Sequence, residues 1–248
     1  MPLEMIVEAA VLALLVACGY VGVKTYVRLR RPNLAPYFLR RRLTVMAFLI
    51  LLIAGAKIFE DVLSGESRVL DERLLLFVHN QVPAALTSFF NAVTILGSAV
   101  VVLPVAALAV ICFTVVKRRF EAILVMASVA AGAALVIAIK AAAGRVRPAL
   151  WDTQWYWGSS FPSGHTVHTA ALSTALALCA ARQWPRYAPL ALSAALGWTG
   201  LVALSRLVLG VHWPTDVLAA ICLGSFVPLT IHIAMELRFE LAHRTGVT

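Results

Sequence analysis

The sequence is poor in charged residues, and in acidic residues above all. Charged residues make up 13% of the 248 positions, against about a quarter in an ordinary soluble domain. The 12 Asp and Glu residues form no cluster suited to a divalent cation, so we expect neither a metal nor another cofactor. With 61% hydrophobic residues, the composition excludes a soluble globular domain and predicts a membrane protein.

Cysteine is also scarce, and no basic residue precedes the first apolar run, residues 5–27. A secretory signal carries positive charge before its apolar part, so we interpret 5–27 as a retained span with its N-terminus outside. The alternative is a lipoprotein cleavage box at Leu15-Val-Ala-Cys18. The four cysteines lack CxxC spacing and neighbouring histidines, which favours small core or lipid-facing roles: Cys18, Cys112, Cys179 and Cys222.

Apolar runs long enough to cross a bilayer recur along the chain. About 20 apolar residues span roughly 30 Å of hydrocarbon. The runs predict seven membrane spans: 5–27, 43–63, 94–116, 120–143, 162–182, a sixth from residue 186, and 214–237. The more polar segment 64–91 predicts one or two short amphipathic helices on the membrane surface. We therefore predict an all-α, polytopic membrane helical bundle.

The net charge of +9 follows from membrane orientation and does not indicate nucleic-acid binding. The basic residues fall in short clusters between spans, and one side of the membrane receives fourteen of the twenty-one, which predicts that this side is cytoplasmic. These residues are Lys24, Arg28, Arg30, Arg31, Arg40, Arg41, Arg42, Lys117, Arg118, Arg119, Arg182, Arg186, Arg238 and Arg244. Segments 64–91, 144–162 and 205–213 then share the outer face.

The stretch from Ser205 to Asp216 places polar side chains at the edge of the hydrocarbon layer. Unpaired polar groups there cost several kcal/mol each, which indicates that the stretch is a functional site. Pro214 favours a helix start, so His212 would lie at the mouth of a helix. Asp216, four residues on, can hold the imidazole in one tautomer and stabilise its charged form. We expect His212 to act as a nucleophile or base.

Two further outer segments carry groups that suit an anion. Lys140, Arg147 and Arg206 supply cationic donors. The sequence Pro162-Ser-Gly-His165 predicts a helix start whose free backbone N–H groups and dipole favour a bound anion. An anion-binding site with two histidines, one nucleophilic and one acidic, is what phosphoryl transfer requires.

Three motifs in order resemble the type-2 phosphatidic-acid phosphatase superfamily. They are Lys140-x6-Arg147-Pro148, Pro162-Ser-Gly-His165 and Ser205-Arg-x5-His212-x3-Asp216. The resemblance implies a six-helix phosphatase domain at residues 43–237, with an added N-terminal span and basic linker at 1–42 and a cytoplasmic tail at 238–248.

The resemblance also implies roles for single residues. His212 would form a covalent phosphohistidine, Asp216 would hold its other ring nitrogen, and His165 would protonate the departing oxygen and then activate water. The phosphoryl oxygens would be bound by Lys140, Arg147, Arg206, the Ser163 hydroxyl and the Gly164 N–H. The sequence leaves two roles open, because Arg145 could join this anion site or face lipid head groups, and His168 could line the pocket or pack in the core.

The expected activity is hydrolysis of a phosphate monoester or diphosphate of a membrane lipid on the outer face of a bacterial inner membrane. Undecaprenyl diphosphate is the favoured substrate, followed by phosphatidylglycerol phosphate and phosphatidic acid, because the compact loops favour a small head group. Two alternatives stay open: a phosphotransferase to a lipid or sugar acceptor, and a non-catalytic transporter of anionic lipids.

Overall fold

A computed structural model describes residues 2–153 and 157–245, and its secondary structure in those ranges is entirely helical. The chain divides into two compact units, Met1–Lys57 and Ile58–Thr248. The first unit holds α1 (Pro2–Arg30), the short helices η1 (Pro32–Leu34) and α2 (Ala35–Arg40), and most of α3 (Arg42–Ser64). The boundary between the units falls inside α3, whereas the sequence-based domain boundary lies at 42/43.

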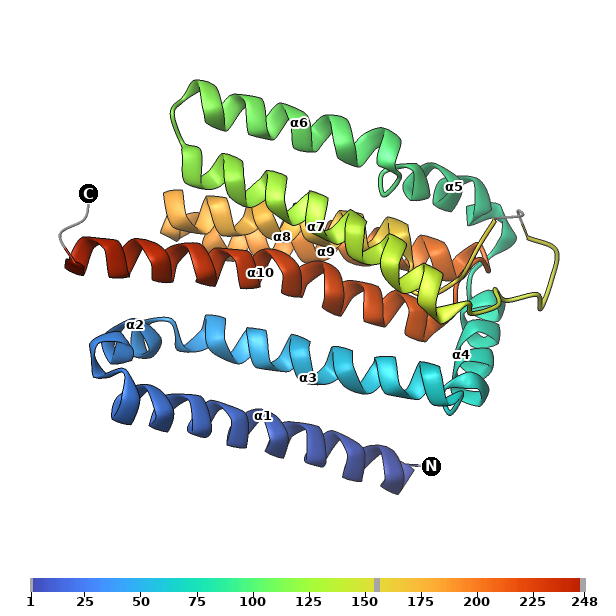
Figure 1. Ribbon diagram of the computed structural model, residues 1–248. Coiled ribbons are helices and arrows are strands. Elements are labelled where there is room, and N and C mark those ends of the chain that lie inside the picture. Colours follow the sequence, from blue (N-terminus) through green and yellow to red (C-terminus); the bar gives the residue numbers. More distant parts are fainter. Residues whose placement is uncertain (1, 154–156, 246–248) are drawn as a thin grey trace. The chain divides into compact units, whose positions relative to one another are not determined.

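The second unit contains the remaining helices. They are α4 (Arg68–Gln81), η2 (Ala84–Leu86), α5 (Thr87–Ile95), α6 (Ala99–Val115), α7 (Arg119–Ala143), α8 (Gly164–Gln183), η3 (Pro185–Tyr187), α9 (Ala188–Val208) and α10 (Pro214–Thr245). The helices α6 to α10 run along the unit, and α4 crosses one of its ends (Figure 1). The all-α, multi-pass membrane architecture predicted from the apolar runs is confirmed.

The spans differ in detail from those predicted. Five helices in the described ranges are long and apolar enough to cross a membrane, and a sixth span results if the bent pair 84–95 and 99–115 counts as one. The run predicted as a span from Thr94 is therefore broken, because α5 ends at Ile95 and α6 begins at Ala99 after a bend of 40°.

A span was predicted over 162–182, but α8, which lies there, is not among the helices of the described ranges that are long and apolar enough to cross a membrane. This helix is the central helix of the second unit. It packs against α7, α9 and α10, and its first turns carry two histidines and several hydroxyl groups. Small residues let the neighbouring helices approach it. A Cβ added to Gly224 of α10 would lie 2.7 Å from the Val167 carbonyl oxygen, so a larger residue there would force α8 and α10 apart.

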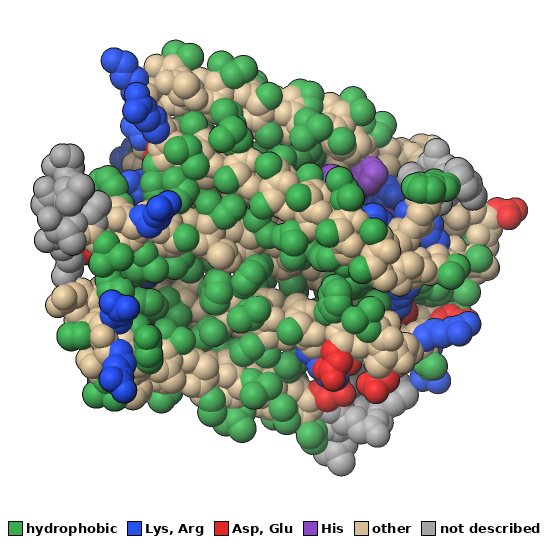
Figure 2. All heavy atoms as spheres, in the orientation of Figure 1, with side chains coloured by type: hydrophobic (Ala, Val, Ile, Leu, Met, Phe, Trp, Pro, Cys, Tyr) green, Lys and Arg blue, Asp and Glu red, His purple; other side chains and the backbone are tan. Residues whose placement is uncertain are grey.

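The two ends of the second unit differ in their side chains. Lys and Arg side chains lie where α6 turns into α7, and hydrophobic side chains cover the length of these helices (Figure 2). At the opposite end, α7 and α9 finish, α8 and α10 begin, and histidine and basic side chains are visible together (Figures 1 and 2).

Candidate functional site

Four helix ends bring the predicted site residues to one end of the second unit. Gly144 ends α7 in the left-handed conformation with φ of 56°, which glycine adopts without strain. Lys140 therefore lies in the last turn of α7, and the chain enters the loop with Arg147 after Ala143. Pro214 occupies the first turn of α10, which fixes where that helix begins after His212. Gly144 and Pro214 therefore determine where α7 ends and where α10 begins, next to Lys140 and His212.

The contacts of His212 define which ring nitrogen carries a proton. Its Nε2 atom lies 3.3 Å from Nη1 of Arg147, and a guanidinium group can only donate hydrogen bonds. Nε2 must therefore accept, which leaves the proton on Nδ1. That atom faces Oδ2 of Asp216 at 3.4 Å, a long separation of the kind that shortens when a substrate is bound. The unprotonated Nε2 is the atom available for nucleophilic attack.

Burial keeps His212 neutral. Its side chain is 2% exposed, and burial lowers its pKa to about 4, although the hydrogen bond and charge of Asp216 act in the opposite direction. The positive charges of Arg206 and Arg147 lower the pKa further. At neutral pH the imidazole therefore keeps the lone pair that a nucleophile needs.

The three cationic side chains named from the sequence are held by neutral acceptors. Lys140 and Arg147 both donate to the Ser159 carbonyl oxygen, in the second case at 3.4 Å, and Arg147 also donates to the Val211 carbonyl at 2.9 Å. The fully buried Arg206 donates to the Thr94 hydroxyl at 2.6 Å. Each of these acceptors is uncharged, and each bond fixes the orientation of the cation that donates it.

Charge within this group of residues is unbalanced in favour of cations. It contains four cationic side chains, Lys140, Arg145, Arg147 and Arg206, and two carboxylates, Asp71 and Asp216. The excess of two positive charges matches the charge of a phosphate monoester dianion. In a partly buried site such an excess favours an anionic ligand strongly, because charges interact more strongly there than in water.

The start of α8 faces the same site. The backbone N–H of Ser163 donates to the Asp216 carbonyl at 3.2 Å, which fixes α8 against α10. The Ser163 hydroxyl accepts from Thr166 at 3.1 Å and so keeps its own proton for another acceptor, while Gly164 opens the helix. His165 is half-buried, and a positive charge on the His212 ring acts on its imidazole.

The two residues with open roles now have defined contacts. Arg145 pairs with Asp71 and with Asp216, in each case at 2.6 Å. Its guanidinium is therefore engaged by carboxylates. His168 is half-buried one turn after His165 and lies within electrostatic range of Lys140.

Sequence reasoning missed three residues that bind the cationic side chains of the site directly but lie in other parts of the chain or outside the motifs. Asp71, Thr94 and Ser159 contact Arg145, Arg206 and Lys140 respectively. Asp71 lies 74 positions before its partner Arg145 in the chain. No spacing rule connects residues so far apart. The amphipathic character of segment 64–91 indicates a helix at the membrane surface, but it does not indicate that Asp71 pairs with Arg145.

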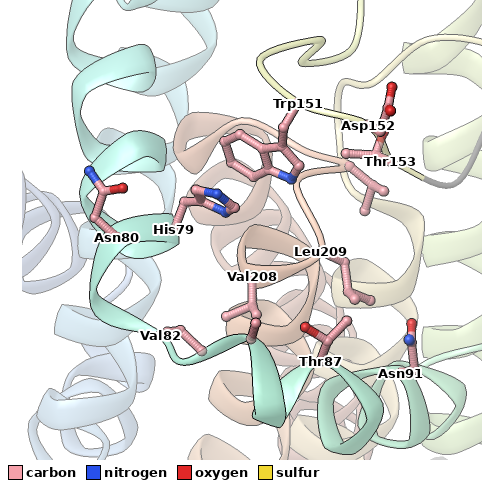
Figure 3. Close-up of a pocket in the computed structure, with 12 residues that line it drawn as sticks. His79, Asn80, Val82, Thr87, Asn91, Trp151, Asp152, Thr153, Val208 and Leu209 are labelled. Carbon is pink, nitrogen blue, oxygen red and sulfur yellow. The ribbon is translucent and has the colours of Figure 1, made fainter.

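A cavity of about 870 Å³ lies beside the histidine loop, residues 209–213, which joins α9 to α10 and carries His212 (Figure 3). Among the described residues, neither His165 nor His212 lines this cavity, but Val211, directly before His212, does. The Trp151 indole stacks on the His79 ring, with centroids 3.9 Å apart, and both line the cavity. Its other walls carry polar side chains from α4, α5 and the loop after Trp151: Asn80, Thr87, Asn91, Asp152 and Thr153.

The structure is that of a helical membrane protein whose two histidines, His165 and His212, are influenced by the charges of Arg147 and Arg206. The family model described as PAP2 superfamily matches residues 120–240, the segment that holds all three motifs. The resemblance predicted from those motifs is confirmed by this match.

Curated relatives match over short segments. Phosphatidylglycerophosphatase B of Escherichia coli is 46% identical over 63 residues, which cover 25% of this chain and 24% of that protein. Lipid A 1-phosphatase of Rhizobium johnstonii is 35% identical over 86 residues, 34% of this chain and 32% of that protein. The chain thus spans about a quarter to a third of the length of these relatives.

Two solved structures share the fold. A transmembrane PAP2-type phosphatidylglycerolphosphate phosphatase from Bacillus subtilis superposes with a TM-score of 0.66 at 23% identity, covering 79% of this chain and 96% of that chain. LpxE from Aquifex aeolicus gives a TM-score of 0.51 at 22% identity, covering 68% and 95%.

Proposed function

We propose that the protein is a membrane lipid phosphatase that transfers the phosphoryl group of a lipid phosphate monoester or diphosphate to His212 and then to water. The observation that carries the proposal is the geometry of the imidazole. Its Nε2 lone pair is directed at a cluster with two excess positive charges, and its Nδ1 faces a carboxylate. The relatives with 46% and 35% identity, named for the removal of phosphate from lipids, support the same chemistry.

In the first step Nε2 of His212 attacks the phosphorus, and the bond to the lipid oxygen breaks. The phosphorylated ring gains positive charge, which the Asp216 carboxylate stabilises through Nδ1–H. His165 gives a proton to the departing lipid oxygen, so a lipid alcohol leaves neutral and a lipid phosphate leaves with one negative charge fewer. Lys140, Arg147, Arg206, the Ser163 hydroxyl and the Gly164 N–H bind the phosphoryl oxygens, and this stabilisation replaces that of a divalent ion.

In the second step His165, now unprotonated, removes a proton from a water molecule that attacks the same phosphorus. The bond between phosphorus and Nε2 breaks, and inorganic phosphate is released. His212 regains its neutral form because its buried environment lowers the pKa to about 4.

The substrate is a lipid whose phosphate reaches the site at the membrane surface. The compact loops predicted from the sequence favour undecaprenyl diphosphate, whose head group is small. The names of the relatives direct attention to phosphates on glycerol and on the sugar of lipid A. The site faces the outer side of a bacterial inner membrane in this proposal, because the basic clusters at the other helix ends favour the cytoplasm.

The proposal is tested by phosphate release from a panel of detergent-solubilised lipids with the wild type and His212→Ala. The panel holds undecaprenyl diphosphate, phosphatidylglycerol phosphate, phosphatidic acid and lipid A 1-phosphate. We expect release by the wild type alone, with or without EDTA. Binding without release would instead support an anionic-lipid transporter. A phosphorylated product formed from an added lipid or sugar alcohol would support a phosphotransferase.

A further inference from the structure

Asp71 is a fully buried carboxylate that does not belong to any of the three motifs. It lies on α4 with an exposed fraction of 0%, and its carboxylate bonds to Thr215 at the start of α10 and to Arg145 in the loop after α7. It accepts the backbone N–H of Thr215 at 2.8 Å and the Thr215 hydroxyl at 2.7 Å. A buried carboxylate is costly unless it is paired and hydrogen-bonded, and here both conditions are met.

The charge partner of Asp71 is Arg145, which also binds the carboxylate that faces the nucleophile. Nη2 of Arg145 lies 2.6 Å from Oδ2 of Asp71, and Nη1 lies 2.6 Å from Oδ1 of Asp216. Nη2 also donates to the Ser67 hydroxyl at 3.2 Å, and Nη1 to that of Thr215 at 2.9 Å. The planar guanidinium therefore joins the two carboxylates in one fixed geometry.

The second oxygen of Asp216 completes a connected series of side chains. Its Oδ2 accepts the N–H of Trp213 at 2.9 Å and faces Nδ1 of His212 at 3.4 Å. The order Asp71, Arg145, Asp216, His212 thus runs from α4 to the ring. Before the ring, two negative charges and one positive charge leave one net negative charge.

We propose that Asp71 is a positioning residue for phosphoryl transfer: it holds Arg145 and thereby sets both the orientation and the effective charge of Asp216 toward His212. The inference rests on the proposed function. If Asp71 were absent, Arg145 would pair with Asp216 alone, and the net charge beside the ring would rise from negative to neutral. The carboxylate would then stabilise the phosphorylated imidazole less.

A purely structural role for the same bonds, fastening α4 to α10, makes a different prediction. It would lower the amount of folded protein but would not change the protonation of the nucleophile. The charged and titratable groups that face His212 from the other elements stay in place in an Asp71 variant: Arg147 from the loop after α7, His165 from α8, Arg206 from α9 and Asp216 from α10. A shift in the pH profile can therefore be assigned to Asp71.

The first test compares Asp71→Asn with Glu72→Gln, which removes the same charge from the next, exposed position of α4. The substrate is whichever panel lipid the wild type hydrolyses fastest. For Asp71→Asn we expect kcat to fall by about 10- to 100-fold, the usual effect of losing a supporting partner, while KM stays the same. The acidic limb of kcat/KM should move to lower pH. Glu72→Gln should match the wild type in kcat, in KM and in the pH of the acidic limb.

A second variant protects the test against misfolding. Arg145→Gln leaves both carboxylates without their cation, so its acidic limb should move to higher pH, opposite to that of Asp71→Asn. The double variant Asp71→Asn/Arg145→Gln restores the wild-type net charge and should bring the limb back. Because the two shifts have opposite signs, either single variant that folds is sufficient.

The inference is overturned if the wild type is active and neither single variant shifts the limb, or if Asp71→Asn behaves as Glu72→Gln does. Those results leave the proposed function standing. A wild type that releases phosphate from no lipid in the panel overturns the proposed function, and the inference with it.

Discussion

Gly210 gives the sharpest structural prediction, because two independent costs meet at one residue. Its φ of 66° lies in the left-handed region, and a Cβ added there would lie 2.6, 2.7 and 2.8 Å from Cζ2, Cε2 and Nε1 of Trp151. The indole cannot move freely, since it is stacked on His79. Gly210→Ala should therefore disturb the loop that positions His212, two residues on.

The expected magnitude follows from these two terms. A left-handed non-glycine residue costs about 1–2 kcal/mol, and overpacking a rigid contact costs about 1–3 kcal/mol. The sum, about 2–5 kcal/mol, corresponds to a fall in Tm of roughly 4–20 °C for a chain of this size. Thermal unfolding of the purified variant in detergent measures this shift, and phosphate release reports the disturbance at His212.

Gly65→Ala is the matched control. Gly65 has φ of 80°, but nothing lies within 4 Å of its added Cβ, so this variant carries the backbone cost alone. The difference between the two variants isolates the contact with Trp151. Adding Trp151→Ala to Gly210→Ala should recover that part of the loss, as a double-mutant cycle requires. Equal Tm values for Gly210→Ala and Gly65→Ala would refute the reasoning.

Three further predictions concern the chemistry. Asp216→Asn should lower kcat by roughly 10⁴-fold, as the loss of the orienting carboxylate does in serine-protease triads, and a loss below tenfold in a steady-state assay would contradict its role. Arg206→Ala should lower kcat by roughly 10²- to 10³-fold because it removes a phosphoryl-oxygen donor, and unchanged phosphate release would remove Arg206 from the site. Burial lowers the pKa of His212 from 6.5 to about 4, so kcat/KM should be lost as pH falls through about 4. The free energy of unfolding should also fall as pH falls from 6.5 to about 4, because in this window the unfolded chain binds a proton that the folded chain does not. An acidic limb at 6.5 that disappears in another histidine variant would contradict this assignment.

The chemistry-bearing ends of the helices could be predicted because their signals are local. Pro214 and the sequence Ser163-Gly164 mark helix starts, and the structure begins α10 and α8 at Pro214 and Gly164. The aspartate at position 216, one helical turn after His212, could be paired with that histidine by spacing alone. Their catalytic roles stay predictions until activity is measured.

The remaining part of the site depends on contacts that leave no periodic signal. The bend between α5 and α6 could not be predicted, because residues 94–116 form one nearly continuous apolar run in the sequence. At that bend, a Cβ on Gly97 would overlap Cγ1 of Val202 and would lie 3.3 Å from the Cβ of His165, so the turn between α5 and α6 lies close against α9 and α8. The pairing of Asp71 with Arg145 likewise depends on the tertiary fold, since it joins α4 to the loop after α7.

The central claim is that His212 carries the phosphoryl group. It is tested most directly by mixing the purified protein with a lipid labelled in its terminal phosphate, quenching within one turnover in alkali and measuring label bound to protein. The account predicts label bound to the wild type and none bound to His212→Ala. Phosphate release by a wild type that never carries label, or label that persists in His212→Ala, would contradict the account.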